Sequence, residues 1–369
     1  MLLVLSSCGR CHQAMCLPGE ETQLFLRDVI AGEGPSELKI RTLSPRQQTL
    51  NFEVEGRPYS GELFLPAETP RAAILFIPGT TTDGNQDPRM LALARSLARG
   101  GFSVLIPDLK NLRELKITPG EIDEIADTFS YLASQSDWAP EGRAGMAAVS
   151  YIVGPSLLAA RQARIRDQVK FVLGIGAYYD LHEVIGYVTT GQFQDPAGQW
   201  QFLEPNAHGK WVLVLSNTDR IANAQDRQTL ERIARIKIAN PEAPIVDLRQ
   251  SLVSKEGQAL VDLMENRDPE QVDTLISQLP VSVRTDLDAL TLKGKDFSQL
   301  TARVYLMHGD KDSLIPYPQS ARLAEVLPGA RRWLIKGFGH VEFNGDLDTF
   351  EAWSMACLTD ALLQERAAR

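Results

Sequence analysis

The sequence has few residues of the kinds that hold metal ions or form disulfide frameworks. Only five of its 369 residues are histidines and only four are cysteines. Cys8, Cys11 and Cys16 crowd the N-terminus, while Cys357 stands alone near the C-terminus. The sequence contains no H-E-x-x-H motif and no paired C-x-x-C motifs, so we expect no metal site. The uneven cysteine spacing also predicts that no disulfide framework holds the fold.

The chain also lacks a basic surface pattern and a long apolar run. Its net charge is −9 at pH 7 and its pI is about 5.2, so a nucleic-acid partner is not expected. No stretch reaches the roughly 18 apolar residues of a transmembrane helix. The hydrophobic fraction of 44% is enough for a sizeable core. The length suits one large α/β domain with an insertion or two smaller domains.

The N-terminal segment MLLVLSSCGRCHQAMC is compatible with three interpretations. The tetrapeptide LSSC is similar to a lipobox, which would put a lipid anchor on Cys8 and the protein in the cell envelope, but the preceding apolar run is short for a signal peptide. The pentapeptide CGRCH matches the pattern of c-type haem attachment, the mark of an electron-transfer protein. No haem-sized helical domain surrounds it, so we expect no cofactor. The third interpretation is a plain tail of a cytoplasmic protein.

Predicted strands and helices alternate through the first half of the chain. The alternating runs at 48–56 and 59–66 predict a hairpin. Continuous apolar runs predict strands that are buried on both faces, at 72–79, 102–109, 144–149 and 169–180. Apolar residues at helical spacing predict helices between them, at 90–101, at 120–135 and after Ser150. This alternation predicts an α/β fold with a mostly parallel sheet and helices on both faces.

The alternation is interrupted after Asp180. Residues 181–300 are mostly amphipathic helical segments, with one apolar run at 210–217 that is compatible with a strand or a buried helix. Strands resume at 302–310 and 331–337, and a final helix follows at about 346–366. We therefore expect three parts, which are an N-terminal tail or extension (1–44), an α/β core (45–180 and 301–369) and an inserted helical cap (181–300).

Three side chains of the types that serine hydrolases use each follow a separate predicted strand, in the order Ser150, Asp312, His340. Serine hydrolysis needs a hydroxyl, an imidazole that takes its proton and a carboxylate that orients the imidazole. Loops at the carboxyl ends of strands are where α/β folds keep reactive groups. Ser156 is the other candidate nucleophile and Asp180 the other candidate acid. His182 and His208 lie in the predicted cap and are expected to be structural.

With this order established, the chain resembles the α/β-hydrolase family over residues 45–366. The segment HGDKDSLIP resembles the acid loop of that family, GFGH its histidine loop, and FIPGTTTDG the loop after its third strand. The resemblance implies that the backbone N–H groups of Thr80 and Tyr151 form an oxyanion hole. It also implies a small-molecule substrate and no cofactor. Tyr178 and Tyr179, at the junction with the cap, are expected to line the pocket.

The turn around Ser150 departs from the G-x-S-x-G pattern of the family, because Ala148 and Ile152 replace the two glycines. A helix that begins at Pro155 would make 151–154 a wider turn in which Ile152 points aside. Two functions remain open. One is a serine hydrolase that cleaves an ester, thioester or amide through an acyl-enzyme. The other is a non-catalytic protein of the same fold with a binding role.

Overall fold

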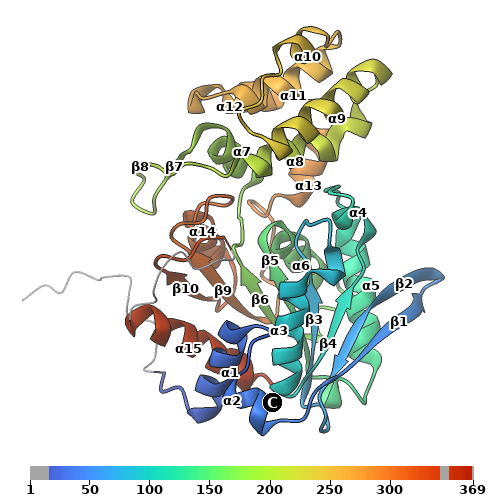
Figure 1. The fold of residues 1–369 in the computed structure, drawn as a ribbon, viewed down its shortest axis with the longest axis vertical. Coiled ribbons are helices and arrows are strands. Elements are labelled where there is room, and N and C mark those ends of the chain that lie inside the picture. The colour runs from blue at the N-terminus through green and yellow to red at the C-terminus, as the bar shows by residue number, and fades with distance from the viewer. Residues whose placement is uncertain (1–15, 341–348, 368–369) are drawn as a thin grey trace, which may run out of the picture.

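The structure is a computed structural model that describes residues 16–340 and 349–367. Eight strands form one sheet in the order β1-β2-β4-β3-β5-β6-β9-β10 (Figure 1). Strand β2 pairs antiparallel with β1 and β4, and the remaining neighbours are parallel. The strands are β1 (Arg46–Val54), β2 (Arg57–Leu65), β3 (Ala72–Ile77), β4 (Phe102–Pro107), β5 (Ala144–Val149), β6 (Val169–Ile175), β9 (Arg303–Gly309) and β10 (Arg331–Ile335). The predicted mostly parallel sheet is confirmed.

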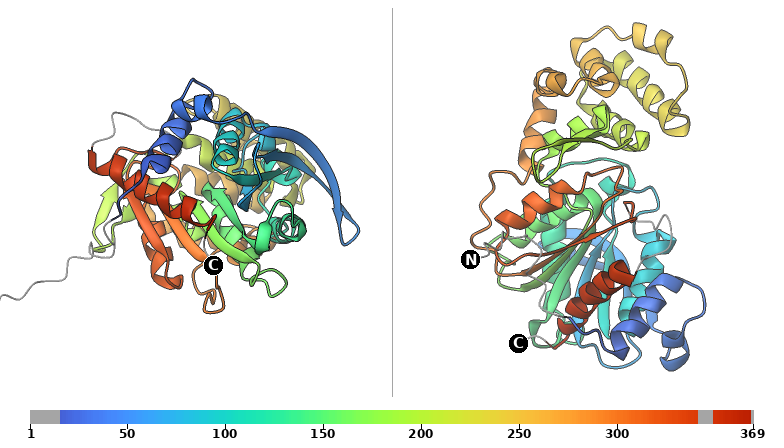
Figure 2. Two further views of the ribbon diagram at one scale, coloured as in Figure 1. Left: turned by 90° about the horizontal axis from the view of Figure 1, so that it is seen from below. Right: turned by 90° about the vertical axis from the view of Figure 1, so that its left-hand side faces the viewer.

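Helices cover both faces of this sheet (Figures 1 and 2). On one face, Phe25, Leu97 and Leu358 from three different helices share an apolar cluster with the strands. On the other face, Phe129 and Leu157 belong to a second cluster. The first face carries α1 (Glu20–Ala31), α2 (Glu37–Arg41), α3 (Pro88–Arg99) and α15 (Thr349–Gln364), and the second carries α5 (Glu121–Ser134), α6 (Val153–Ala160) and α14 (Pro318–Val326). Helix α4 (Lys110–Arg113) follows β4.

A set of helices is inserted between β6 and β9 and lies above one end of the sheet (Figure 1). The inserted elements are α7 (Leu181–Thr190), β7 (Gln192–Gln194), β8 (Trp200–Phe202), α8 (Ala207–Asn217), α9 (Ala224–Ala239), α10 (Val246–Gln250), α11 (Lys255–Glu265), α12 (Val272–Ser277) and α13 (Val281–Leu290). The ambiguous apolar run at 210–217 is part of helix α8, which buries Trp211 and Val214. The apolar side chains of this run therefore pack within a layer of helices.

The N-terminal extension contains two helices that pack against the core. Helix α1 lies beside α15, where the Thr22 hydroxyl donates to Asp360 and Arg366 pairs with Glu21 at 2.6 Å. Between α1 and α2, the buried carboxylate of Asp28 accepts hydrogen bonds from the hydroxyls of Ser36 and Ser96. The described part of the extension is therefore fixed to the core by polar contacts as well as by apolar ones.

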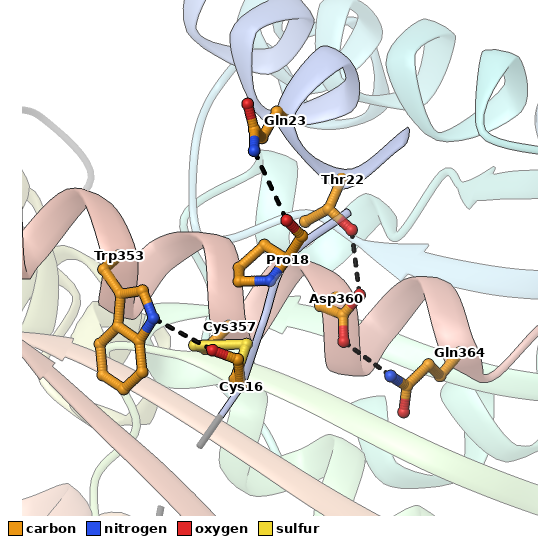
Figure 3. Close-up of a disulfide and its surroundings, with 8 residues drawn as sticks. All are labelled: Cys16, Pro18, Thr22, Gln23, Trp353, Cys357, Asp360 and Gln364. Atoms are coloured by element: carbon orange, nitrogen blue, oxygen red, sulfur yellow. Dashed lines mark hydrogen bonds between the residues drawn. A yellow bond between two sulfur atoms is a disulfide. The ribbon is translucent and has the colours of Figure 1, made fainter. Parts of the chain in front are cut away.

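A disulfide between Cys16 and Cys357 fastens this extension to α15 (Figure 3). The two Cα atoms lie 5.7 Å apart, and the indole of Trp353 donates to the carbonyl of Cys16. We expected no disulfide framework, and the structure instead has this one crosslink between its two described cysteines. The two cysteines are 341 residues apart in the sequence, and only the packing of α1 on α15 brings them together. Cys8, with the predicted lipid anchor, and the CGRCH segment lie outside the described residues.

Replacing both Cys16 and Cys357 with serine is expected to lower the free energy of unfolding by about 4 kcal/mol, because the crosslink restricts the unfolded chain. For a protein of this length the loss corresponds to a fall in Tm of about 5 °C. Thermal unfolding with and without a reductant checks this. The reductant should lower the Tm of the wild type and leave that of the double variant unchanged, and an equal effect on both would contradict the prediction.

Candidate active site

Ser150 occupies a strained turn at the carboxyl end of β5. Its φ is +67°, a left-handed conformation that costs a non-glycine residue about 1 kcal/mol or more. Residues Ser150–Ile152 form one turn of 3₁₀-helix, and α6 begins directly at Val153. The expected wide turn that ends at Pro155 is therefore wrong, because the helix starts two residues earlier. Only one 3₁₀ turn separates the strand from the helix, which is the strand–turn–helix arrangement of the turn called the nucleophile elbow.

Ala148 and Ile152 replace the two glycines that normally let strand and helix pack closely at this turn, and glycines at two other positions allow the close packing instead. Ile152 and Ala148 are fully buried in the core, so both side chains are accommodated inside. A Cβ atom at Gly174, on the neighbouring strand, would lie 2.6 Å from Cγ1 of Val153. A Cβ atom at Gly154 would lie only 2.0 Å from Oη of Tyr178. These two glycines allow α6 to pack closely on the sheet although Ile152 is β-branched.

His340 and Asp312 form a hydrogen-bonded pair in the loops after β10 and β9. Nδ1 of His340 lies 2.7 Å from Oδ2 of Asp312. The other oxygen, Oδ1, accepts the backbone N–H groups of Leu314 and Ile315, both at 2.9 Å. Burial opposes ionisation of this carboxyl, but the charges and hydrogen bonds of His340 and His308 outweigh it, so the pKa of Asp312 lies well below its usual range. Asp312 is therefore a buried carboxylate that orients the imidazole.

Two further residues, His308 and Gly176, support this pair. His308 is buried, and its Nε2 lies 2.9 Å from the carbonyl oxygen of Ile315 and 3.3 Å from Oδ2 of Asp312. At Gly176, where φ is +66°, a Cβ atom would lie 3.2 Å from Cε1 of His340 and 3.3 Å from Oδ2 of Asp312. From the sequence, His308 was a histidine at the end of a predicted strand, in the segment HGDKDSLIP, and Asp312 was preferred as the reactive group of that loop.

Ser150 and His340 line the same cavity, which has a volume of about 590 Å³. Thr80, Tyr151 and Tyr178 also line it, but Tyr179 is not among the described lining residues. The N–H groups of Thr80 and Tyr151 donate no hydrogen bond to another part of the chain that the structure describes. The Thr80 hydroxyl is likewise buried without a partner among the described residues. These donors are available to an anionic group that forms near Ser150.

Known proteins resemble this chain in structure and not in sequence. No protein-family model matches it, and no curated protein matches it. A Legionella pneumophila protein assigned as a hydrolase shares 13% identity, with 94% of this chain and 96% of that chain covered and a TM-score of 0.57. Est1E from Butyrivibrio proteoclasticus shares 14% identity over 87% of this chain and 99% of that chain, with a TM-score of 0.46. Dienelactone hydrolase from Anabaena variabilis shares 13% identity over 87% of this chain and 97% of that chain, with a TM-score of 0.45.

The chain has the α/β-hydrolase fold. The sheet order, the flanking helices and the structural similarity to the Legionella protein agree on this point. In this fold, reactive groups gather at the carboxyl ends of the parallel strands. Ser150 after β5, Asp312 after β9 and His340 after β10 all occupy such positions.

The alternative residues of this α/β-hydrolase fold are engaged in other contacts. Ser156 is buried within α6 and donates to the carbonyl of Ile152 at 2.7 Å. Asp180 caps α7 by accepting the N–H of His182, and it pairs with Lys293 at 2.9 Å. His182 lies on α7 with Nε2 3.5 Å from Asp288. His208 lies in α8.

A buried carboxyl beside Tyr151 connects the elbow with the inserted helices. Glu121, at the start of α5, is fully buried, and burial raises its pKa to about 7. It accepts the N–H of Thr118 at 2.9 Å and the Tyr151 hydroxyl at 3.4 Å. The Tyr151 ring stacks on Tyr178, whose hydroxyl donates to the carbonyl of Leu290 at the end of α13. From the sequence, Glu121 was only an acidic residue in the first turn of a helix.

The described residues form neither a metal-binding cluster nor a membrane-spanning helix. Across 16–340 and 349–367, no group of three or more His, Cys, Asp and Glu residues could hold a metal ion. Over the same ranges, no helix is both long enough and apolar enough to cross a bilayer.

Proposed function

We propose that the chain is a serine hydrolase that cleaves an ester, thioester or amide bond through an acyl-enzyme. Ser150 is the nucleophile, His340 the general base and then acid, and Asp312 the carboxylate that orients His340. The observation that carries this proposal is the 2.7 Å Asp312–His340 hydrogen bond, next to a cavity that both His340 and the strained Ser150 line. The assignment of the Legionella protein as a hydrolase is in line with it.

The proton path follows from the Asp312–His340 contact. Because Oδ2 of Asp312 is an acceptor, the imidazole holds its proton on Nδ1 and leaves the lone pair of Nε2 free. Nε2 takes the proton of the Ser150 hydroxyl while Oγ attacks the substrate carbonyl. The same nitrogen then protonates the leaving group as the acyl-enzyme forms. Water, deprotonated by His340, cleaves the acyl-enzyme and restores Ser150.

The negative charge that develops on the carbonyl oxygen needs hydrogen-bond donors. We assign this role to the N–H groups of Thr80 and Tyr151, each contributing about 3 kcal/mol to the stabilisation of the transition state. Both residues line the cavity beside Ser150. The Tyr151 hydroxyl donates to Glu121 and the Tyr151 ring stacks on Tyr178, and these two contacts hold the Tyr151 N–H group in position.

We also propose that residues 181–300 act as a cap over a core formed by 45–180 and 301–369. Apolar side chains of α7, α8 and α13 line the cavity that contains Ser150 and His340, including Val188, Val212 and Leu287. A layer of this kind excludes water from the reacting groups and encloses a small substrate.

Labelling with a fluorophosphonate probe tests the nucleophile. The wild-type protein should form a stable adduct on Ser150, identified by mass spectrometry of the modified peptide, because an activated serine attacks phosphorus as it attacks a carbonyl. The variant Ser150→Ala should not be labelled. Ser156→Ala is the matched control, because that hydroxyl lies six residues further along and bonds to the helix backbone.

The outcomes separate the two hypotheses drawn from the sequence. Absence of labelling in the wild type at neutral pH would overturn the hydrolase proposal and favour a non-catalytic role for the fold. Labelling that persists in Ser150→Ala and disappears in Ser156→Ala would move the nucleophile to Ser156.

A further inference from the structure

The apolar lining of the cavity that contains Ser150 and His340 comes from two groups of elements, which we call its cap-side lobe and its sheet-side lobe. The cap-side lobe is lined by α7, α8 and α13, with Val212 as an example. The sheet-side lobe is lined by α1, α3, α15 and the strands behind them, with Val29 and Leu173 as examples. Ser150 follows β5 directly, and Ala147 of the same strand belongs to the sheet-side lining.

The sheet-side lobe is almost free of polar groups. The described residues of α1, α15 and the strands that line it are apolar, apart from Thr359. Near the start of α3 the polar residues are Asp87 and Arg89, which pair with each other at 2.8 Å. Such a lining stabilises a hydrocarbon group by removing it from water. It would leave the hydroxyl groups of a sugar or the amides of a peptide without hydrogen bonds.

The N-terminal extension supplies one wall of this lobe, and several contacts hold that wall in place. Four residues of α1, namely Phe25, Leu26, Val29 and Ile30, line the lobe. The disulfide of Cys16 with Cys357 and the ion pair of Glu21 with Arg366 fix α1 to α15, which forms the adjoining wall (Figure 3). The lobe is therefore a built feature of the folded chain, bounded on two sides by helices that are covalently joined.

We propose that the sheet-side lobe holds the unbranched aliphatic acyl chain of a carboxylic ester whose carbonyl carbon is attacked by Ser150. This inference rests on the proposed serine hydrolase function and names its substrate class. A chain bound along apolar walls contributes binding energy for each methylene that leaves water. Since the acyl chain remains in the lobe in the transition state, this energy raises kcat/KM.

A series of p-nitrophenyl esters tests the proposal. We expect kcat/KM to rise by up to about fourfold for each added methylene, and so by on the order of 10²-fold from butanoate to octanoate. The variant Val29→Trp fills the sheet-side lobe and should lower the ratio of kcat/KM for octanoate to kcat/KM for butanoate by at least about tenfold. Val212→Trp makes the same replacement in the cap-side lobe and is the matched control, with no selective loss for octanoate.

The Tm of thermal unfolding reports whether each variant is folded, and Val29→Ala gives a second test without added bulk. Widening the lobe should shift the preference toward longer esters. Equal kcat/KM for butanoate and octanoate in the wild type would overturn the inference and leave the proposed function intact. A selective loss for octanoate in Val212→Trp and not in Val29→Trp would also overturn it, because the chain would then lie under the inserted helices. Hydrolysis of neither ester by a wild-type protein that the fluorophosphonate probe still labels would overturn the inference alone, and absence of both hydrolysis and labelling would overturn the proposed function as well.

Discussion

Replacing His340 with alanine is expected to lower kcat for ester hydrolysis by about 10⁶-fold. Without the imidazole, no group takes the proton of Ser150 during attack or returns it to the leaving group. Among the described residues that line the cavity with Ser150, His340 is the only histidine. The backbone donors at Thr80 and Tyr151 remain in this variant, so a residual rate about 10³-fold above the uncatalysed reaction should persist. Steady-state kinetics with p-nitrophenyl butanoate measure the loss.

The matched control for this change is His182→Ala. His182 lies on α7 and contacts Asp288 at 3.5 Å, away from the Asp312–His340 pair. This variant should keep kcat within about threefold of the wild type. Comparable losses in the two variants would show that removal of either histidine disturbs the protein as a whole, and would contradict a specific role of His340.

The sequence allowed the strand-end positions of three candidate site residues to be predicted, because strand-end loops carry local signals. Ser150, Asp312 and His340 each follow an apolar run that forms a strand, and their chain order is the one that the fold imposes. The hydrogen bond between Asp312 and His340 joins two loops that were expected to meet at one edge of the sheet. The position of a side chain at a strand end can be predicted where one short segment determines both the strand and the residue that follows it.

Features that depend on contacts between distant segments could not be predicted. The disulfide joins Cys16 to Cys357 only because α1 packs on α15, and no local pattern indicates that packing. The room around the elbow comes partly from Gly174, which lies on a different strand from Ser150. The residues of the elbow alone left a helix start at Pro155 open, because they do not show this neighbour. The burial of Glu121 beside Tyr151 is a tertiary effect of the same kind.

Asp312→Asn is expected to lower kcat by about 10⁴-fold through the tautomer of His340. In the wild type, Oδ1 of Asp312 accepts two backbone N–H groups while Oδ2 accepts Nδ1–H of His340. An asparagine keeps its single oxygen toward the two N–H donors, because a second donor there would clash with both. Its NH₂ group then faces Nδ1 of His340, which must become an acceptor. The ring proton moves to Nε2, and Nε2 can no longer take the proton of Ser150.

The neighbouring carboxylate gives a matched control for this prediction. Asp310 lies two residues earlier in the same loop, and its Oδ1 accepts only the N–H of Gly337 among the described residues, at 2.8 Å. Asp310→Asn should therefore change kcat by less than about tenfold. If Asp312→Asn kept more than a tenth of the wild-type kcat while Asp180→Asn lost most of it, the orienting carboxylate would be Asp180 at the start of α7. The two buried hydrogen bonds that fix the Asp312 carboxylate would then serve only to hold the loop after β9 in place.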